Sequence, residues 1–222
     1  MTDLWSERAE RYRTSDAHRE GPDLDLIVAW AAGAGTALDV ATGGGHVARR
    51  LREAGIRVVS SDPAPGMRPD AVCTAEHLPF ADGSFDVVVT RLAAHHFGDV
   101  RQAVHEMARV AATSVLVVDN GFMGEDVEQA ETLRDPSHVR NYSEAEWRSF
   151  AKDAGLDVED VRSFQKPITL QPWLDRCGCA GADAERCVEL LGNRVRGDVV
   201  VLDRIALRCS VTRPPSRPGT RP

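Results

Sequence analysis

The stretch Ala37-Leu38-Asp39-Val40-Ala41-Thr42-Gly43-Gly44-Gly45-His46 decides the fold of this chain. It reads as a buried strand, a turn of three glycines and the start of a helix, and a second apolar run, 57–60, leads to Asp62. This layout suits a ligand that contains adenosine, because glycines let the backbone come close while an acid at the next strand tip accepts hydrogen bonds from ribose hydroxyls. We therefore expect an adenosine-type ligand at the carboxyl edge of a sheet.

The spacing of the glycines distinguishes between adenosine ligands. A dinucleotide seats its pyrophosphate on a helix N-terminus behind the pattern G-x-G-x-x-G. Here the glycines are contiguous, and Ala48 stands where the third spaced glycine would fall. No Lys-Ser/Thr pair of the kind that binds nucleoside triphosphates follows, and Asp39 stands four residues before Gly43. The loop therefore disfavours both a dinucleotide and a nucleoside triphosphate.

Composition narrows the class of partner and the compartment. The 222 residues, 42% of them hydrophobic, suit one domain with a sizeable core. The formal charge of −7 argues against nucleic acid, whose binding depends on basic patches. The start, 1–8, lacks the apolar segment of a secretory signal, and no run of about 18 apolar residues occurs. We expect a cytoplasmic protein without a membrane partner, as a monomer or a homodimer.

The cysteines give weak evidence for a metal. The chain has five, Cys73, Cys177, Cys179, Cys187 and Cys209. Reduced thiols are the default in a cytoplasmic chain. The spacing Cys177-Gly178-Cys179 is a poor one for two zinc ligands. Together with Cys187 these cysteines make three candidate ligands, and the nearby sequence offers no fourth. We expect no metal site.

Strand-like and helix-like segments alternate along the chain. Expected strands are 37–40, 57–60, 71–73, 85–90, 114–118, 158–164 and 199–209. Expected helices lie within 3–20, at 24–32 behind an Asp23 cap, after the glycines through Leu51, at 100–110 behind an Asp99 cap, and from a Ser143–Glu146 capping box to Gly155. Such alternation implies right-handed βαβ units. The predicted fold is α/β with a mainly parallel sheet.

Five sequence features follow one another between residues 37 and 155. They are Asp39 to Gly45; Asp62 with Pro63 and Met67; Thr74 to Asp86; Arg91 to Phe97; and Glu106 to Val110. Together they resemble the class I S-adenosylmethionine (SAM) methyltransferases, in the small-molecule subgroup related to ubiquinone-type enzymes and to methyltransferase domain 11. The resemblance implies a Rossmann-like, doubly wound sheet of seven mostly parallel strands with helices on both faces.

The resemblance also implies SAM as the cofactor and a set of residues that bind it. These are Tyr12, Asp39, Ala41, Thr42, Gly43, Gly45, Asp62, Pro63, Met67, Thr74, Ala75, Glu76 and Arg91. In this set Asp62 accepts both ribose hydroxyls and Met67 packs on adenine. Thr74 departs from the family pattern, which often has Asp there. Arg91 approaches the methionyl end, with a structural salt bridge as the alternative.

Three residues are candidates for catalysis. Methyl transfer is an in-line displacement, so the enzyme orients the nucleophile and in some cases takes its proton. In similar small-molecule O-methyltransferases a His-His pair and an acid after strand five are base candidates. Here these are His95, His96 and Asp119. A structural role for His96, and a turn-capping role for Asp119, stay open.

The predicted function is transfer of a methyl group from SAM to a small organic molecule, in specialised metabolism. Oxygen is the favoured acceptor atom, while nitrogen and carbon stay open. The alternative is a SAM-binding cyclase-type or regulatory protein of the same fold. We expect one domain over 1–211, with cap helices in 1–33, substrate or lid segments at 120–142 and 165–190, and a disordered tail, 212–222. In the first lid segment His138, Arg140, Asn141 and Tyr142 are candidates for contact with the acceptor.

Overall fold

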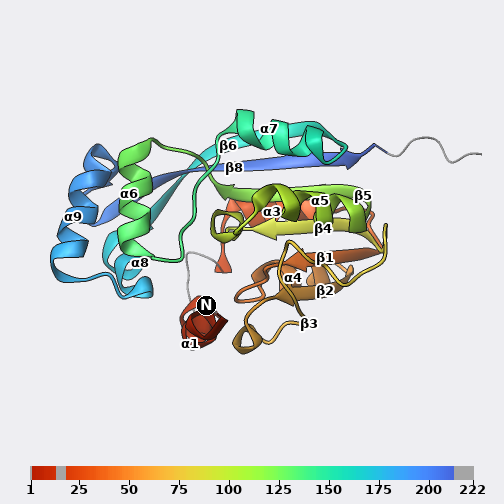
Figure 1. Cartoon of the computed structure of the whole chain (residues 1–222), viewed down its shortest axis with the longest axis horizontal. Coiled ribbons are helices and arrows are strands. Elements are labelled where there is room, and N and C mark those ends of the chain that lie inside the picture. The colour runs from red at the N-terminus through yellow and green to blue at the C-terminus, as the bar shows by residue number, and fades with distance from the viewer. Residues whose placement is uncertain (1, 14–18, 213–222) are drawn as a thin grey trace, which may run out of the picture.

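The architecture rests on a central twisted sheet (Figure 1). The computed structural model describes residues 2–13 and 19–212. The strand order is β3-β2-β1-β4-β5-β8-β6, and β7 pairs with β8 outside this path. The strands are β1 Thr36–Val40, β2 Arg57–Asp62, β3 Ala71–Val72, β4 Phe85–Arg91, β5 Ala111–Asn120, β6 Leu156–Thr169, β7 Val195–Arg196 and β8 Val199–Val211. Pairs among the first five strands are parallel, and β8 runs antiparallel to β5 and β6.

This arrangement confirms the doubly wound, mostly parallel seven-stranded sheet. The eighth strand, β7, has two residues, too few to give a sequence pattern. It forms a tight hairpin with β8 through Gly197, whose φ of 64° is one that glycine adopts readily. Strand β6 is longer than the predicted 158–164, because residues 165–169, which include Pro167, also pair with β8. Proline is tolerated there because β6 lies at the edge of the sheet.

Helices cover both faces of the sheet. The described helices are α1 Thr2–Arg13, α3 Pro22–Trp30, α4 His46–Glu53, α5 Val100–Val110, α6 Glu125–Arg134, α7 Glu144–Asp153, α8 Leu170–Cys177 and α9 Gly181–Leu191, with short 3-10 turns η1 Pro65–Met67, η2 Ala94–His96 and η3 Gly192–Arg194. Strand β4 shows why two layers form, because Val87 and Val89 pack with α3 and α4 while Val88 packs with α5 and α7. Every described helix is too short to cross a bilayer.

Two of the predicted helix caps are correct and one is wrong. Asp99 accepts a hydrogen bond from the Gln102 N–H at the start of α5, and Ser143 and Glu146 form the capping box of α7. Asp23, in contrast, is not the cap of α3: Gly21 occupies that position, and Asp23 is fully buried inside the first turn. Its carboxylate is used in a long-range salt bridge instead.

Helices α6, α8 and α9 form a separate cluster around the end of β6 and the start of β8, to the left in Figure 1. They come from the two segments expected to face the substrate, 120–142 and 165–190. Helix α1 lies between this cluster and η1, and its Ala9 packs on Ala64 and Met67. The predicted tail lies outside the described residues except for Thr212, and part of the expected N-terminal helix and loop, 14–18, does as well.

Candidate functional site

A buried acid at the end of β1 forms hydrogen bonds that hold the glycine loop in place. Asp39 is 1% exposed, and its Oδ2 accepts hydrogen bonds from the Thr42 hydroxyl at 2.5 Å and the Ala48 N–H at 3.0 Å. Burial raises the pKa of Asp39 to about 6, although these two hydrogen bonds oppose the rise. Asp39 therefore ties the loop to the first turn of α4.

The three glycines are needed for two different reasons. Gly43 and Gly45 have φ angles of 51° and 75°, in the left-handed region that glycine adopts without strain. At Gly44 the constraint is space, because a Cβ there would lie 2.6 Å from His46 Nε2 and 2.9 Å from the Tyr12 carbonyl oxygen. The same loop carries Ala41, a non-glycine residue at φ 55°. The chain thus turns sharply at the carboxyl end of β1.

Asp62 ends β2 next to this loop. Its Oδ2 accepts a hydrogen bond from the Gly43 N–H at 3.0 Å, and its Oδ1 accepts one from the Ala64 N–H at 2.9 Å. Burial raises the pKa of this carboxyl above its usual value. Each carboxylate oxygen has a second lone pair, so both can still accept a hydrogen bond from a ligand hydroxyl. The predicted position at the strand tip is therefore the observed one.

A cavity of about 300 Å³ opens over these residues. Of the predicted cofactor-binding residues, those that line it are Tyr12, Asp39, Ala41, Thr42, Gly43, Asp62, Pro63, Met67, Thr74, Ala75, Glu76 and Arg91. Gly45 is not among them, because it forms the left-handed cap at the start of α4. Glu76 contributes structurally too, since its Oε1 accepts the Gly98 N–H at 3.0 Å.

Several lining residues were not expected from the sequence. These are Trp5, Gly44, His46, Val47, Leu92, Ala93, His96, Phe97 and Gly98, and the sequence predicts only a catalytic role for His96. The sequence could have predicted Trp5 as a lining residue, because it stands seven residues before Tyr12 and so lies on the same face of the helix. The ring centroids of Trp5 and Tyr12 lie 5.6 Å apart, and both rings come from α1.

Arg91 is held in a buried ion pair. Its Nε lies 2.5 Å from Asp23 Oδ2, and the same oxygen accepts a hydrogen bond from Arg204 Nη1 at 3.2 Å. Burial alone would raise the pKa of Asp23, but the two guanidinium groups outweigh burial and lower it. The salt-bridge alternative for Arg91 is thus realised, while its side chain still reaches the cavity wall.

His95 and Asp119 form a buried pair where β4 and β5 end. The His95 Nδ1 lies 2.5 Å from Asp119 Oδ1, and the His95 backbone N–H donates to Asp119 Oδ2 at 3.0 Å. Burial lowers the pKa of His95, but the charge and hydrogen bond of Asp119 outweigh it and raise the value overall. The pKa of Asp119 is lowered, because His95 outweighs burial there too. Asp119 therefore holds the His95 ring instead of merely capping a turn.

His96 has a different environment from its neighbour. Its Nδ1 lies 3.0 Å from the Ser137 carbonyl oxygen, so Nδ1–H donates and Nε2 carries the lone pair. Its ring packs edge-on against Trp5, with centroids 4.7 Å apart. Burial, followed by the charge of His95, lowers its pKa to about 3. His96 is therefore neutral at physiological pH.

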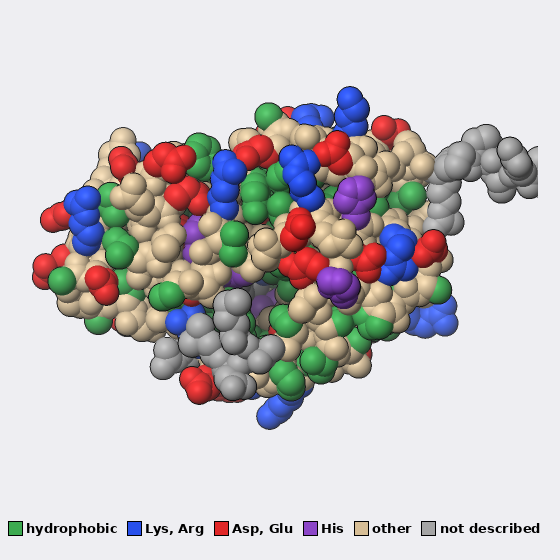
Figure 2. Space-filling view, in the orientation of Figure 1, with side chains coloured by type: hydrophobic (Ala, Val, Ile, Leu, Met, Phe, Trp, Pro, Cys, Tyr) green, Lys and Arg blue, Asp and Glu red, His purple; other side chains and the backbone are tan. Residues whose placement is uncertain are grey.

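A second cavity, of about 40 Å³, adjoins the first. The two share Tyr12, Leu92 and His96, whereas His95 lines the smaller one alone. Leu92 has a φ of 54°, so the chain also turns sharply after β4. Histidine side chains are visible in the hollow at the centre of Figure 2. The two histidines thus stand at the junction of the cavities.

The four acceptor-contact candidates of the first lid segment have structural partners. His138 Nε2 lies 2.9 Å from Glu128 Oε2, and Asn141 Nδ2 donates to Glu128 Oε1 at 2.9 Å. Arg140 forms an ion pair with Glu146 at the surface, and Tyr142 is part of the core beside α7. In the described part of the chain, the lining of neither cavity includes them.

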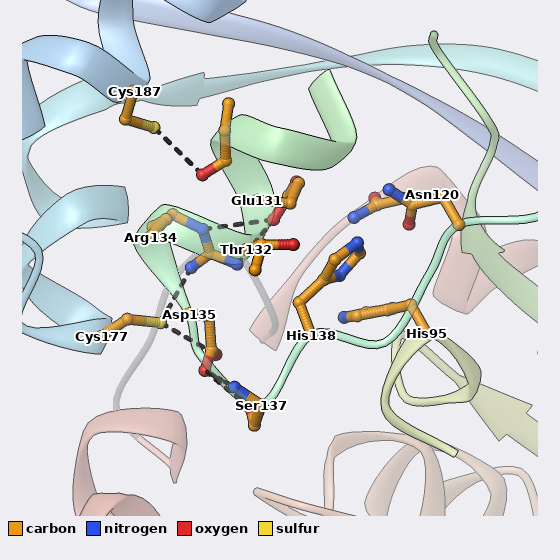
Figure 3. Close-up of polar contacts among 12 residues, drawn as sticks. His95, Asn120, Glu131, Thr132, Arg134, Asp135, Ser137, His138, Cys177 and Cys187 are labelled. Carbon is orange, nitrogen blue, oxygen red and sulfur yellow. Dashed lines mark hydrogen bonds and ion pairs between the residues drawn. The ribbon is translucent and has the colours of Figure 1, made fainter. Parts of the chain in front are cut away.

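The cysteines are all free thiols. Cys177 Sγ donates to Asp135 Oδ2 at 3.1 Å and accepts from Arg134 Nη1 at 2.9 Å (Figure 3). Burial raises the pKa of Cys177 to about 11, so it is a protonated structural group. Over the residues that the structure describes, no three potential metal ligands come together.

Comparisons with known proteins agree with this geometry. Residues 38–118 match the methyltransferase domain family. YcgJ, an uncharacterized methyltransferase of Bacillus subtilis strain 168, is 34% identical over 206 residues, which cover 82% of this chain and 81% of YcgJ. The crystal structure of YcgJ superposes with a TM-score of 0.77 at 26% identity, over 86% of this chain and 98% of that one.

Two further solved structures have similar folds. BH2331 of Bacillus halodurans C-125 has a TM-score of 0.75 at 27% identity, over 86% of this chain and all of that chain. Geranyl diphosphate C-methyltransferase of Streptomyces coelicolor A3(2), solved with S-adenosyl-L-homocysteine, has a TM-score of 0.61 at 13% identity, over 86% of this chain and 77% of that chain. The second likeness is one of fold.

Proposed function

The chain belongs to the class I SAM-dependent methyltransferases, and on that premise we propose that it methylates a small organic acceptor by direct displacement. Oxygen is the favoured acceptor atom. The observation that carries the proposal is the pair of adjoining cavities, one lined by the adenosine-type residues and the other by His95. Because they share a wall at Leu92 and His96, a donor and an acceptor would meet there.

The larger cavity fits SAM. Its volume of about 300 Å³ lies in the range of small-molecule sites. Asp62 would accept the ribose hydroxyls, the glycine loop would border the methionyl part, and Met67 with Ala75 would enclose adenine. Nothing lies within 4 Å of a Cβ built on Gly43, so the loop leaves open space on that side. When bound, SAM supplies a methyl group on a positively charged sulfur, ready for transfer to a nucleophile.

We assign His95 as the proton acceptor and Asp119 as its positioning residue. The 2.5 Å contact places the His95 proton on Nδ1, which leaves the Nε2 lone pair for the acceptor's hydroxyl. Asp119 also stabilises the charge that His95 gains on taking that proton. His96, with a pKa of about 3, is too weak a base at neutral pH, so its role is to form the wall that separates the cavities.

Helices α6, α8 and α9 would cover the acceptor. Helix α6 supplies Arg134 and α8 supplies Trp173 and Arg176 to the smaller cavity, α9 packs behind them, and α1 supplies Tyr12 to both cavities. Arg8 of α1 forms an ion pair with Asp135 at 3.0 Å, so α1 and this cluster are joined by a buried contact. We expect this contact to help keep water away from the transfer site.

The test combines binding and product analysis. Calorimetry should show 1:1 binding of SAM and no binding of NAD. His95→Ala should keep the SAM affinity and lose methyl transfer, whereas His105→Ala, at an exposed position on α5, should keep both. SAM binding with no methylated product from any acceptor tried would favour the cyclase-type or regulatory alternative. Failure to bind SAM would refute the proposal.

A further inference from the structure

The smaller cavity has an unusual balance of charge. The charged or ionisable side chains that line it include the guanidinium groups of Arg134, Arg176 and Arg204, together with His95. Within the described residues, its lining holds no aspartate and no glutamate. The carboxylates that pair with these groups, Asp119, Glu131 and Asp23, are not part of the described lining. The surface that a ligand would meet is therefore basic.

Arg204 gives the clearest sign of incompletely compensated positive charge. It is 3% exposed, and its Nη1 donates to Asp23 Oδ2, the oxygen that also accepts from Arg91 Nε. Its Nε–H is buried and has no hydrogen-bond partner among the described residues. Burial and the neighbouring Arg91 lower the pKa of Arg204 to about 10, although Asp23 opposes the change. A buried donor without an acceptor is costly, so an acceptor supplied by a ligand would be stabilising here.

Arg134, another lining residue of the same cavity, is fixed in place by its neighbours. Its Nη2 donates to Glu131 Oε2 at 2.9 Å, and its Nη1 donates to Cys177 Sγ (Figure 3). Its guanidinium group lies over the Trp173 ring, 4.3 Å from the centroid. Such a rigid, planar group suits recognition of an anion, because little side-chain entropy is lost on binding.

The size of the cavity limits the ligand group that can enter. A volume of about 40 Å³ holds about three water molecules, which is the size of a carboxylate or a phosphate. Ile168 and Leu202 add apolar walls. Asn120 adds a buried amide with one unpartnered atom, and this amide can present either its oxygen or its NH₂. A compact polar group beside a short apolar stem matches these walls.

We propose that this cavity binds a compact anionic group of the methyl acceptor, a carboxylate or a phosphate, through Arg204, Arg134 and Arg176. The inference rests on the proposed function, since it takes the acceptor to occupy this cavity. The acceptor is then a small organic acid or phosphate ester. Its charged end lies against the arginines, and its nucleophilic atom lies at the shared wall near His95 and His96.

The test uses the arginine Nε–H signals of ¹⁵N-labelled protein loaded with S-adenosyl-L-homocysteine. Acetate, acetamide of the same shape, and inorganic phosphate are titrated separately at constant ionic strength. Arg204→Lys assigns the Arg204 signal by its loss. The expected result is a saturable shift of that signal with acetate, phosphate or both, and none with acetamide. The two anions distinguish an organic acid from a phosphate ester.

A second variant tests the same inference in case Arg204→Lys does not fold. Arg176→Gln, on α8 and outside the Asp23 ion pairs, should weaken anion binding by about tenfold. Arg186→Gln, at an exposed position on α9, should leave it unchanged. Equal responses to acetate and acetamide, or no saturable response to any anion in protein that binds S-adenosyl-L-homocysteine, would overturn the inference and leave the proposed function intact. Failure to bind S-adenosyl-L-homocysteine would count against the proposed function itself.

Discussion

Replacing Asp119 with asparagine tests the assignment of His95 as the base. The substitution keeps the shape of the side chain but removes the charge that lies 2.5 Å from His95 Nδ1. A buried, charge-assisted hydrogen bond contributes about 1.5–3 kcal/mol, which corresponds to a fall of about one to two units in the pKa of His95. Loss of the orienting charge also favours the wrong tautomer, so we expect methyl transfer at neutral pH to fall about 100-fold.

The pH profile gives the sign of the effect. His95 accepts a proton only when it is neutral, so activity rises as pH increases through its pKa. Asp119 raises that pKa, and Asp119→Asn should therefore move the acidic limb of the profile to lower pH while lowering its plateau. SAM affinity should stay within about twofold, because Asp119 does not line the larger cavity.

The assay is single-turnover methyl transfer across pH, with calorimetric SAM binding beside it. Asp126→Asn, at an exposed position on α6, is the matched control and should behave as the wild type. An acidic limb that does not move, with a plateau equal to that of the wild type, would refute the role of His95 as base. Loss of SAM binding would show that the variant perturbs the fold instead.

Three further substitutions test the larger cavity. Gly66→Ala would place a Cβ 2.6 Å from Ser6 Cα and so displace α1. SAM affinity, measured by calorimetry, should fall about tenfold, whereas the control Gly121→Ala should bind SAM as the wild type does. Equal affinities of the two variants would refute the claim that the position of α1 matters for SAM binding. Asp62→Asn should weaken SAM binding by about 10- to 100-fold, and an unchanged affinity would contradict its role at the ribose. Asp39→Asn should be more stable than the wild type above pH 6. Burial raises the pKa of Asp39 in the folded protein from 3.8 to about 6. The wild type therefore has the stability that comes from protonated Asp39 below pH 3.8 and loses it as the pH rises to about 6, whereas the asparagine is neutral at every pH. The difference in free energy of unfolding between Asp39→Asn and the wild type should reach about 3 kcal/mol at most. Urea unfolding between pH 4 and 8 measures it, and a difference that does not increase with pH over this range would contradict the prediction.

The sequence predicts the sheet and most of the lining of the larger cavity well, because these depend on local patterns. The β-branched run in β4 and the glycines after β1 each determine their own backbone, and Asp62 needs only its place at a strand end. Parallel strands then bring their carboxyl ends to one edge without further information.

Asp23 shows where local rules fail. An acid before an apolar helix is a good N-cap signal. Its real partners, Arg91 and Arg204, stand 68 and 181 residues away in sequence. The same limit applies to His138 and Asn141, which contact Glu128 and are not among the described residues that line either cavity. The basic lining of the smaller cavity is likewise built from helices and strands distant in sequence, so only the fold reveals it.

Transfer of an intact, isotopically labelled methyl group from SAM is the measurement that tests the central claim most directly. Wild-type protein, incubated with trideuteromethyl-labelled SAM and a panel of small hydroxylated acids, should give a product that carries all three deuterium atoms. His95→Ala should bind SAM equally well and give no such product. A labelled product formed equally by His95→Ala, or no labelled product from the wild type with any acceptor in the panel, would contradict the account.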